Sequence, residues 1–397
     1  MLSRLRSGGP AIQLEAQGKV DEGFVPVVDS FLEGFSAGRD IGASLAVYLE
    51  GQLVIDLHAG HCDRKKSREW QSDTLCCLFS MTKGIAATCV LQAVSEGLIG
   101  LDVPVAEYWE GFANNGKDKI TTRHILAHQS GLVGFHEPVD RDFLYDWEAV
   151  VALLAAETPW WQPGEQHGYH ARSFGFLLGE ILRRVAGRTV GQWIEERLVA
   201  DGELIIGLTP DQIDRCADMV TARIRAGQKT ELTPERREMM SMFQDLTTPT
   251  GAAFQNPSMG PAYMNSTAFR TAEMPAMNGH GTALGVASMY SRINQLLEPA
   301  VMDEATRVQS EGKDQVLRSY SKFGLGYMLY DPRSPIGVKP GSFGHAGAGG
   351  SMAFYDPERQ LAFCFAMNQM QDGVVTGGTS AMQVAHAVYD CLGDSVS

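Results

Sequence analysis

The stretch Leu78-Phe79-Ser80-Met81-Thr82-Lys83 places a hydroxyl and an amine three residues apart, directly before a long apolar segment. Residues 85–94 of that segment are mostly apolar and a glycine follows at Gly97, which predicts a largely buried helix. Because residues i and i+3 share a helix face, we expect the Lys83 amine beside the Ser80 hydroxyl. Ser80 would also face the unpaired N–H groups of that helix, which favour a developing negative charge. The stretch therefore predicts a nucleophilic serine with a base beside it.

The same four-residue pattern occurs twice more, at 310–313 and 319–322. Both copies lie among charges and turn residues, and neither is followed by an apolar helical segment. The structural alternative for the first copy is a helix cap at Ser80 and a surface charge at Lys83. The context favours the first copy as the functional one.

The hydrophobic content and net charge of the chain limit the kinds of partner that it can bind. The chain has 397 residues, is 44% hydrophobic and carries a net charge of −14. A large core is therefore possible, whereas nucleic acid and anionic membrane are disfavoured as partners because both need a basic surface. No apolar run is long enough to span a membrane. We expect a globular protein that acts on a small molecule, and the sequence leaves its oligomeric state open.

The cysteines indicate a reducing compartment. They are odd in number, mostly lie in apolar runs and form no Cys-x-x-Cys pair. The basic N-terminus is not followed by a continuous apolar stretch, so no secretory signal is predicted. We expect a cytoplasmic protein. The seven cysteines are Cys62, Cys76, Cys77, Cys89, Cys216, Cys364 and Cys391.

Periodicity predicts strands at both ends of the chain and helices between them. A tight turn at Gly51-Gln52 joins two β-rich runs and predicts a hairpin, so the sheet is at least partly antiparallel. Ser173 is the expected cap of one helix, and residues 1–24 are expected to form an N-terminal arm. The predicted helices cover 25–35, 120–127, 147–157, 173–187, 281–297 and 379–392, and the predicted strands cover 43–50, 53–58, 323–329, 343–350, 351–355 and 361–367.

Three further features have both a structural and a functional interpretation. His124 and His128 have the i, i+4 spacing of a metal pair, but the glutamate of a zinc-hydrolase helix is missing, so packing or capping is favoured. The adjacent indoles of Trp160 and Trp161 are equally consistent with core and with a substrate wall. Residues 209–280 are rich in methionine, which suits a pocket wall or lid as well as gap-filling core.

Three motifs in chain order resemble a known superfamily. They are Ser80-x-x-Lys83, Tyr169 before the predicted helix at 173–187, and His345-Ala346-Gly347 on a glycine-rich strand. This set is similar to the serine β-lactamases and penicillin-binding proteins, and in particular to their class C-like esterases, the family VIII carboxylesterases. The resemblance covers about residues 25–392.

The resemblance implies an α+β fold, with an antiparallel sheet flanked by terminal helices and an inserted helical domain. The sheet domain would comprise residues 25–75 and 281–397, and the helical domain 76–280, with 209–280 as a pocket or lid segment. The active site would lie between the two domains.

The resemblance also implies roles for individual residues. Ser80 would be the nucleophile, Lys83 would help to deprotonate it, and Tyr169 would act as partner base and then as acid for the leaving group. The oxyanion hole would combine the Ser80 N–H with a backbone N–H near Ala348. The substrate-binding residues would be His345, Gly347, Ala348, Trp160 and Trp161, with no cofactor and no metal.

Two motifs depart from the family pattern. Class C β-lactamases usually have Tyr-x-Asn, whereas here His170 and Ala171 follow Tyr169, so the amide that holds a β-lactam side chain is missing. The usual Lys-Thr-Gly or Lys-Ser-Gly is replaced by the motif at His345, so a permanent cation is missing. These departures favour small neutral esters over β-lactams.

The leading hypothesis is therefore a serine carboxylesterase that works through an acyl-enzyme. With the same residues, β-lactamase, D-amino peptidase or acyltransferase activity is the alternative. A non-catalytic penicillin-recognising domain is disfavoured because Ser80, Lys83 and Tyr169 are all present. An α/β-hydrolase is disfavoured because the chain has no Gly-x-Ser-x-Gly elbow and its strands form hairpins.

Overall fold

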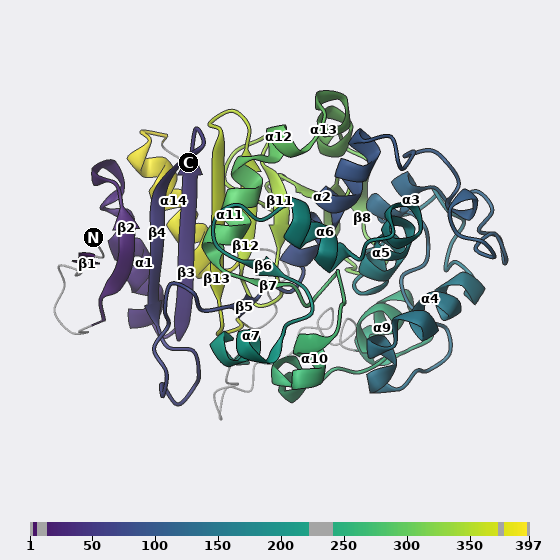
Figure 1. The fold of residues 1–397 in the computed structure, drawn as a ribbon, viewed down its shortest axis with the longest axis horizontal. Coiled ribbons are helices and arrows are strands. Elements are labelled where there is room, and N and C mark those ends of the chain that lie inside the picture. Colours follow the sequence, from purple (N-terminus) through teal and green to yellow (C-terminus); the bar gives the residue numbers. More distant parts are fainter. Residues whose placement is uncertain (1–2, 6–13, 222–240, 372–376, 395–397) are drawn as a thin grey trace.

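A ten-stranded antiparallel sheet forms one half of the molecule in the computed structural model, which describes residues 3–5, 14–221, 241–371 and 377–394 (Figure 1). The hairpin of β3 and β4 pairs through β3 with β13, the last strand of the sheet in chain order, so an early and a late segment of the sequence lie side by side in the middle of the sheet. In spatial order the strands are β1 (Ser3–Leu5), β2 (Ala16–Val20), β4 (Gln52–Gly60), β3 (Gly42–Leu49), β13 (Leu361–Met367), β12 (Met352–Asp356), β11 (Phe343–Ala346), β10 (Met328–Leu329), β9 (Tyr320–Phe323) and β8 (Ser310–Lys313). This arrangement confirms the antiparallel sheet and the predicted α+β class.

Helices cover both faces of the sheet, which explains why β13 is buried along its whole length. Phe363 and Phe365 point toward α1 (Val27–Ser36) and α14 (Thr379–Cys391), the helices from the two ends of the chain. Ala362 and Cys364 point to the other face, where their small side chains let α11 (Ala283–Ser291) approach closely. The large residues therefore fill one layer, and the small ones admit a helix on the other.

The other half of the molecule is helical and surrounds α2 (Met81–Ser95). Every residue from Met81 to Ala93 is buried, so α2 is enclosed on all sides, as the uninterrupted apolar sequence predicts. Elsewhere in the described ranges the α-helices are α3 (Thr122–Leu126), α4 (Trp147–Ala156), α5 (Ser173–Ala186), α6 (Val190–Arg197), α7 (Pro210–Arg215), α9 (Pro249–Gln255), α10 (Thr267–Thr271), α12 (Ile293–Leu296) and α13 (Pro299–Thr306). A small three-stranded sheet of β5 (Cys76–Cys77), β7 (His280–Gly281) and β6 (Leu204–Ile205) lies between the two halves.

The structure differs from the predicted elements at several places. The predicted strand over 343–350 ends at Ala346 as β11, so Gly347 and Ala348 lie in the turn that follows it. The expected N-terminal arm includes β2, which pairs with β4 and so extends the sheet. Ser173 is the first residue of α5 and its hydroxyl has no partner among the described residues, so Ser173 is not the predicted cap. The predicted helix over 281–297 is divided into α11 and α12. The predicted strand over 323–329 is divided into β9 and β10, because Gly326 adopts a φ of 79° and donates its N–H to Leu126 O.

The Met-rich segment packs against the core where the structure describes it. Met274 is fully buried, and Met259, Met264 and Met277 are partly buried against the main hydrophobic cluster. Met239 and Met240 lie outside the described residues. The gap-filling interpretation therefore holds for these four methionines, and a lid over 209–280 stays a prediction.

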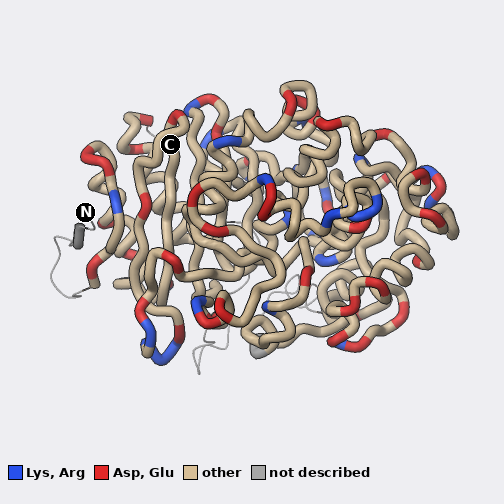
Figure 2. Tube along the Cα trace, viewed as in Figure 1, with Lys and Arg blue, Asp and Glu red and all other residues tan. Residues whose placement is uncertain are grey.

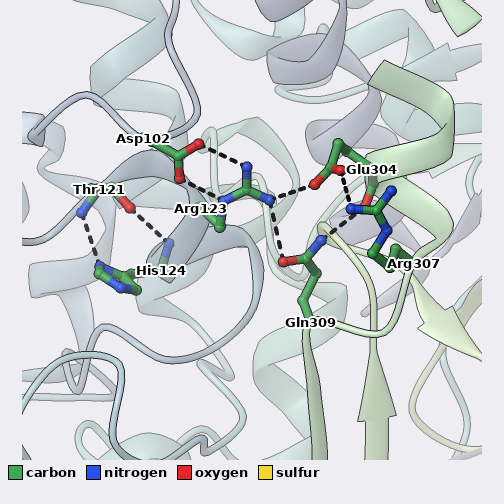
Figure 3. A network of polar contacts seen from close by, with 7 residues as sticks. All are labelled: Asp102, Thr121, Arg123, His124, Glu304, Arg307 and Gln309. Atoms are coloured by element: carbon green, nitrogen blue, oxygen red, sulfur yellow. Dashed lines mark hydrogen bonds and ion pairs between the residues drawn. The ribbon is translucent and has the colours of Figure 1, made fainter. Parts of the chain in front are cut away.

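One arginine connects the helical half to the edge of the sheet (Figure 3). Arg123 of α3 binds both carboxylate oxygens of Asp102, at 2.6 and 2.8 Å, and a carboxylate oxygen of Glu304 on α13 at 2.8 Å. Its guanidinium also donates to the side chain of Gln309, just before β8, at 3.3 Å. Arg307 is paired with Glu304 at the end of this network. Four separate segments are thus held by one planar cation.

Acidic and basic residues alternate around the outside of the molecule (Figure 2). Acidic residues outnumber basic ones, 47 to 33, as the net charge requires. None of the helices in the described ranges has the length and apolarity needed to cross a membrane.

Candidate active site

The candidate nucleophile is held at the N-terminus of α2 by a strained turn. Leu78 follows β5 and donates its N–H to Gly279 O at 2.8 Å, which attaches the turn to the next strand. Phe79 has a φ of 45°, a left-handed conformation that costs a residue with a side chain about 1–3 kcal/mol. Ser80 comes next as the N-cap residue of α2, and no backbone N–H of the helix donates a capping hydrogen bond to its side chain. The strained turn therefore leaves the Ser80 hydroxyl available for chemistry.

Lys83 lies beside Ser80 and is completely buried. Its Nζ is 3.1 Å from Ser80 Oγ and 2.8 Å from each of two backbone carbonyl oxygens, those of Ala171 and Ala276. Nζ also lies 4.6 Å from the centre of the Tyr169 ring. The i, i+3 spacing thus produces the contact that the sequence predicted.

The surroundings of Lys83 favour the neutral amine. Burial holds its pKa well below the usual value, and the nearby positive charge of Arg172 acts in the same direction. Among the described residues no carboxylate forms an ion pair with Lys83. A neutral amine has two N–H groups and one lone pair. The two carbonyls account for both N–H groups, which leaves the lone pair for the Ser80 proton.

Tyr169 lies in the loop before α5 and is 6% exposed. Burial raises its pKa, a hydrogen bond with Ser80 opposes that shift, and the charge of Asp314 adds to it. The ring stacks between Phe254 and Phe323, with centroid distances of 6.4 and 6.2 Å. The phenol is therefore protonated at neutral pH, which suits a proton donor better than a base.

Two backbone N–H groups are available for an oxyanion. Within the described residues, neither the N–H of Ser80 nor that of Ala348 makes a hydrogen bond. Gly347 brings the two segments together, since a Cβ there would lie 2.6 Å from Leu78 O and 2.2 Å from Ser351 Oγ. Only glycine permits this approach between the strand end and the nucleophile turn.

His345 points toward the same site from β11 and is 2% exposed. Its Nδ1 lies 2.7 Å from Ala346 O, and because a carbonyl only accepts, Nδ1 carries the proton. Burial lowers the pKa of His345 to about 3, and Lys83 acts in the same direction. Its Nε2 has no partner among the described residues. His345 is therefore a neutral hydrogen-bond acceptor where the family motif usually has a cation.

A cavity of about 160 Å³ adjoins Tyr169 and His345. Its walls are mainly apolar or aromatic, and Arg333 lies among the lining residues. The guanidinium of Arg333 binds both carboxylate oxygens of Asp331, at 2.7 and 2.9 Å, and lies 3.5 Å from Glu311. Its charge is thus already compensated. The lining residues are Tyr169, Leu317, Ser319, Tyr320, Phe323, Met328, Arg333, Ser334 and His345.

The two tryptophans expected at the substrate site do not line this cavity. Trp160 stacks on His136, with a centroid distance of 4.1 Å, and Trp161 is buried next to Gly168. Trp161 therefore supports the loop that leads to Tyr169. A direct substrate contact by either indole stays a prediction.

The histidines of the neighbouring loops have structural partners. His124 accepts the Thr121 N–H at 3.2 Å and completes the cap of α3. His128 is fully buried and accepts the N–H of His170 at 3.1 Å. His170 donates to Gly168 O at 2.7 Å and accepts from the Ser130 hydroxyl at 2.6 Å. These contacts are capping and packing contacts. For His124 and His128 they agree with the interpretation that the sequence favoured.

Some parts of the site have no sequence signal. The carbonyls of Ala171 and Ala276 hold Lys83, but any residue could supply them. Arg172, three residues after Tyr169, is a partly buried cation that donates to the carbonyls of Phe254 and Pro257. Its position directly before the predicted helix at 173–187 is the sequence feature that could have indicated a place near the site.

Comparisons with known proteins identify the family of this chain. The family model described as Beta-lactamase matches residues 28–386. The Esterase/beta-lactamase LipL of Mycobacterium tuberculosis is 33% identical over 385 residues, which is 92% of this chain and 86% of LipL. The Esterase EstB of Burkholderia gladioli is 28% identical over 176 residues, 40% of this chain and 44% of EstB.

Solved structures show the same similarity. A family VIII carboxylesterase superposes with a TM-score of 0.84 at 34% identity, covering 95% of this chain and 100% of that one. A penicillin-binding protein homologue from Caulobacter crescentus superposes with a TM-score of 0.83 at 33% identity, covering 95% and 99%.

Proposed function

This chain belongs to the beta-lactamase family, and from that premise we propose that it is a serine carboxylesterase that hydrolyses small neutral esters through an acyl-enzyme on Ser80. Its similarity to LipL, EstB and a family VIII carboxylesterase supports the reaction class. The single observation that carries the mechanism is the environment of Lys83. Its amine is buried, uses two carbonyls for its N–H groups and has the Ser80 hydroxyl in the remaining direction.

The first half-reaction acylates the enzyme. Lys83 takes the proton of Ser80, and Ser80 Oγ forms a bond to the ester carbonyl carbon. The carbonyl oxygen gains the negative charge and is stabilised by the N–H groups of Ser80 and Ala348. The bond from carbon to the alcohol oxygen then breaks.

The departing alkoxide needs a proton, and Tyr169 supplies it. Tyr169 regains its proton from Lys83, so the pair transfers one proton from Ser80 to the alcohol. In the second half-reaction a water oxygen forms a bond to the acyl carbon while the same groups take the water's proton. The bond between that carbon and Ser80 Oγ then breaks, Ser80 Oγ receives the proton, and the carboxylic acid is released. Tyr169 thus acts as the acid, a role that the raised pKa of its phenol favours.

The site electrostatics support neutral substrates. His345 is neutral and offers an acceptor, so it cannot form the ion pair that a lysine offers to a carboxylate. Arg333 is compensated by Asp331 and Glu311. A charge-assisted hydrogen bond is worth about 1.5–3 kcal/mol, so its absence costs about ten- to a hundredfold with a carboxylate-bearing substrate. Apolar walls at Phe323 and Met328 suit an uncharged group.

A covalent label tests the nucleophile. A fluorophosphonate probe is expected to modify Ser80, as mapped by peptide mass, and Ser80→Ala is expected to lose both labelling and ester hydrolysis. Ser310→Ala is the matched control, because Ser310 begins another Ser-x-x-Lys match and does not line the cavity. Labelling of Ser310 or Ser319, or full activity in Ser80→Ala, would refute the assignment.

A substrate panel tests the reaction class. A short neutral ester, its carboxylate-bearing analogue, nitrocefin and a D-amino-acid amide are compared by kcat/KM, with and without an added alcohol as acyl acceptor. We expect the neutral ester to be the best substrate by at least tenfold, and His345→Lys to improve nitrocefin more than the ester. Equal efficiency on nitrocefin and the ester would favour β-lactamase activity, and dominant transfer to the alcohol would favour an acyltransferase.

Cytoplasmic residence is part of the proposal. All seven cysteines are free in the structure, and six of them are buried. This state suits a reducing compartment. Cell fractionation with an antibody against the chain checks it, and recovery outside the cytoplasm would contradict it.

A further inference from the structure

A buried carboxylate outside the three motifs holds the backbone of Tyr169. Asp314 follows β8 and is 0% exposed. Its Oδ1 accepts the N–H of Tyr169 at 3.1 Å and the N–H groups of Val316 and Leu317 at 2.8 Å each. One oxygen thus joins its own turn to the loop that carries the candidate acid.

The second carboxylate oxygen ends a directed chain of hydrogen bonds. The Ser321 hydroxyl donates to Asp314 Oδ2 at 3.1 Å, and His167 Nε2 lies 2.9 Å from the same hydroxyl. Because Ser321 uses its proton toward Asp314, His167 Nε2 donates to Ser321. His167 is two residues before Tyr169, so the carboxylate contacts that loop directly and through Ser321.

A backbone contact strengthens the same junction. Gln315 N–H donates to His167 O at 3.0 Å. The turn after β8 therefore binds both ends of the three-residue segment His167 to Tyr169. Among the described residues no arginine or lysine forms an ion pair with Asp314, so the carboxylate is stabilised mainly by these donors. A buried carboxylate that is stabilised this way requires its donors to stay in place.

We propose that Asp314 is a positioning residue that fixes the Tyr169 loop in the active site, an inference that rests on the proposed role of Tyr169 in ester hydrolysis. Asp314 does not touch Ser80 or Lys83. It acts through Tyr169, whose phenol must reach both the nucleophile and the leaving group. The simpler alternative is that Asp314 only closes the turn between β8 and β9.

The chain contains a matched control for this alternative. Asp356, the last residue of β12, accepts the N–H groups of Glu358 and Arg359 in the following turn on Oδ1, two and three residues ahead. The hydroxyl of Tyr389 donates to its Oδ2. Asp356 and Asp314 thus make the same turn contacts, with a hydroxyl on the second oxygen, but Asp356 has no link to Tyr169.

The experiment is a double-mutant cycle on a short neutral ester. Asp314→Ala is expected to lower kcat by about ten- to a hundredfold, because a charge-assisted hydrogen bond to the Tyr169 loop is lost. Asp314→Asn, which keeps an acceptor oxygen, is expected to recover at least part of that loss. In a Tyr169→Phe background, Asp314→Ala is expected to lower kcat less than twofold further. Asp356→Ala is expected to lower the melting temperature and leave kcat within twofold.

The outcomes separate the inference from the proposed function. Suppose that Tyr169→Phe lowers kcat and that Asp314→Ala lowers it by the same factor in the Tyr169→Phe background as in the unmodified protein. Asp314 then does not act through Tyr169, and the inference is overturned. If Asp356→Ala lowers kcat as much as Asp314→Ala, turn closure alone explains the effect. Full activity in Tyr169→Phe overturns the role of Tyr169 in the proposed function and this inference with it. If Asp314→Ala does not fold, the smaller loss of kcat in Asp314→Asn is measured with Tyr169 and with Phe at position 169, and an equal loss in both backgrounds overturns the inference.

Discussion

At the scale of single residues, the site depends on the protonation state of Lys83 and on the positive charge of Arg172. Lys83 must be neutral to act as a base, and its position in the interior makes the charged form expensive. Arg172 remains a cation in the interior although burial lowers its pKa to about 10. It has no acidic partner among the described residues and is held by the carbonyls of Phe254 and Pro257. A permanent charge near Lys83 therefore helps to keep the base unprotonated.

This arrangement predicts a shift in the pH profile. Arg172→Gln removes a positive charge that lowers the pKa of Lys83, so that pKa rises. Because only the neutral amine is active, the acid limb of kcat/KM is expected to move to higher pH. The measurement is kcat/KM on a neutral ester across the acid limb.

Arg184→Gln is the control for this shift. Arg184 lies on α5 and binds Glu180 at 2.7 Å, so its charge is compensated outside the site. The acid limb of kcat/KM in Arg184→Gln is expected to coincide with that of the unmodified protein. An unchanged limb in Arg172→Gln would show that burial alone sets the protonation of Lys83.

At the scale of elements, the oxyanion hole depends on how closely the end of β11 approaches the turn before α2. Gly347 lies against Leu78 O, and the strain at Phe79 orients the next residue, Ser80. The contact of Gly347 with Leu78 O positions the N–H of Ala348 next to the turn that carries Ser80. The hole is thus a property of two elements, and no side chain forms it.

Gly347→Ala is expected to lower kcat by about 10²–10³, the effect of losing one oxyanion donor. The added Cβ would lie 2.6 Å from Leu78 O, so the strand end must move and take the Ala348 N–H with it. Steady-state kinetics and a thermal melt check this together. Gly23→Ala is the control, because a Cβ at Gly23 meets no atom within 4 Å. Equal kcat in both variants would contradict the assigned oxyanion hole.

The sequence predicted those elements whose pattern is local. The apolar run after Ser80 predicted α2, and the run Leu361–Met367 predicted β13 with the correct bounds. The split into β9 and β10 was missed because it follows from a contact between Gly326 and Leu126, far apart in the chain.

The same limit applies to the candidate site. Spacing alone predicted the contact between Ser80 and Lys83, which is 3.1 Å in the structure. The carbonyls that hold Lys83 come from residues 171 and 276, and Asp314 reaches Tyr169 across the fold. Such contacts depend on tertiary structure, and the residue types involved are common, so sequence patterns do not reveal them.

At the scale of the whole molecule, the network at Arg123 attaches the helical half to the edge of the sheet. Planar, bidentate contacts that form a network contribute more to the free energy of unfolding than isolated ion pairs on the surface do. Arg123→Met is therefore expected to lower the free energy of unfolding by about 1–2 kcal/mol and to leave kcat within twofold. Chemical denaturation at low and high salt measures it, with a smaller difference at high salt.

Arg188→Met is the control for this network. Arg188 and Glu196 form a pair whose side chains are 49% and 47% exposed. Its loss is expected to change stability by less than about 0.5 kcal/mol. An equally small change in Arg123→Met would show that the two halves are joined by apolar packing alone.

The pairing of β3 with β13 also has a consequence for synthesis of the chain. Leu49 lies opposite Leu361, about 300 residues later, and the pairing continues to Ala43 and Met367. At about 5–20 residues per second, the ribosome needs roughly 15–60 s to make the partner strand. During that interval one edge of the apolar strand β3 is uncovered in the nascent chain, although Ser80 and Lys83 have already been made. The protein therefore completes its sheet and its candidate site only near the end of translation, and until then the unpaired edge of β3 is exposed to pairing with other chains.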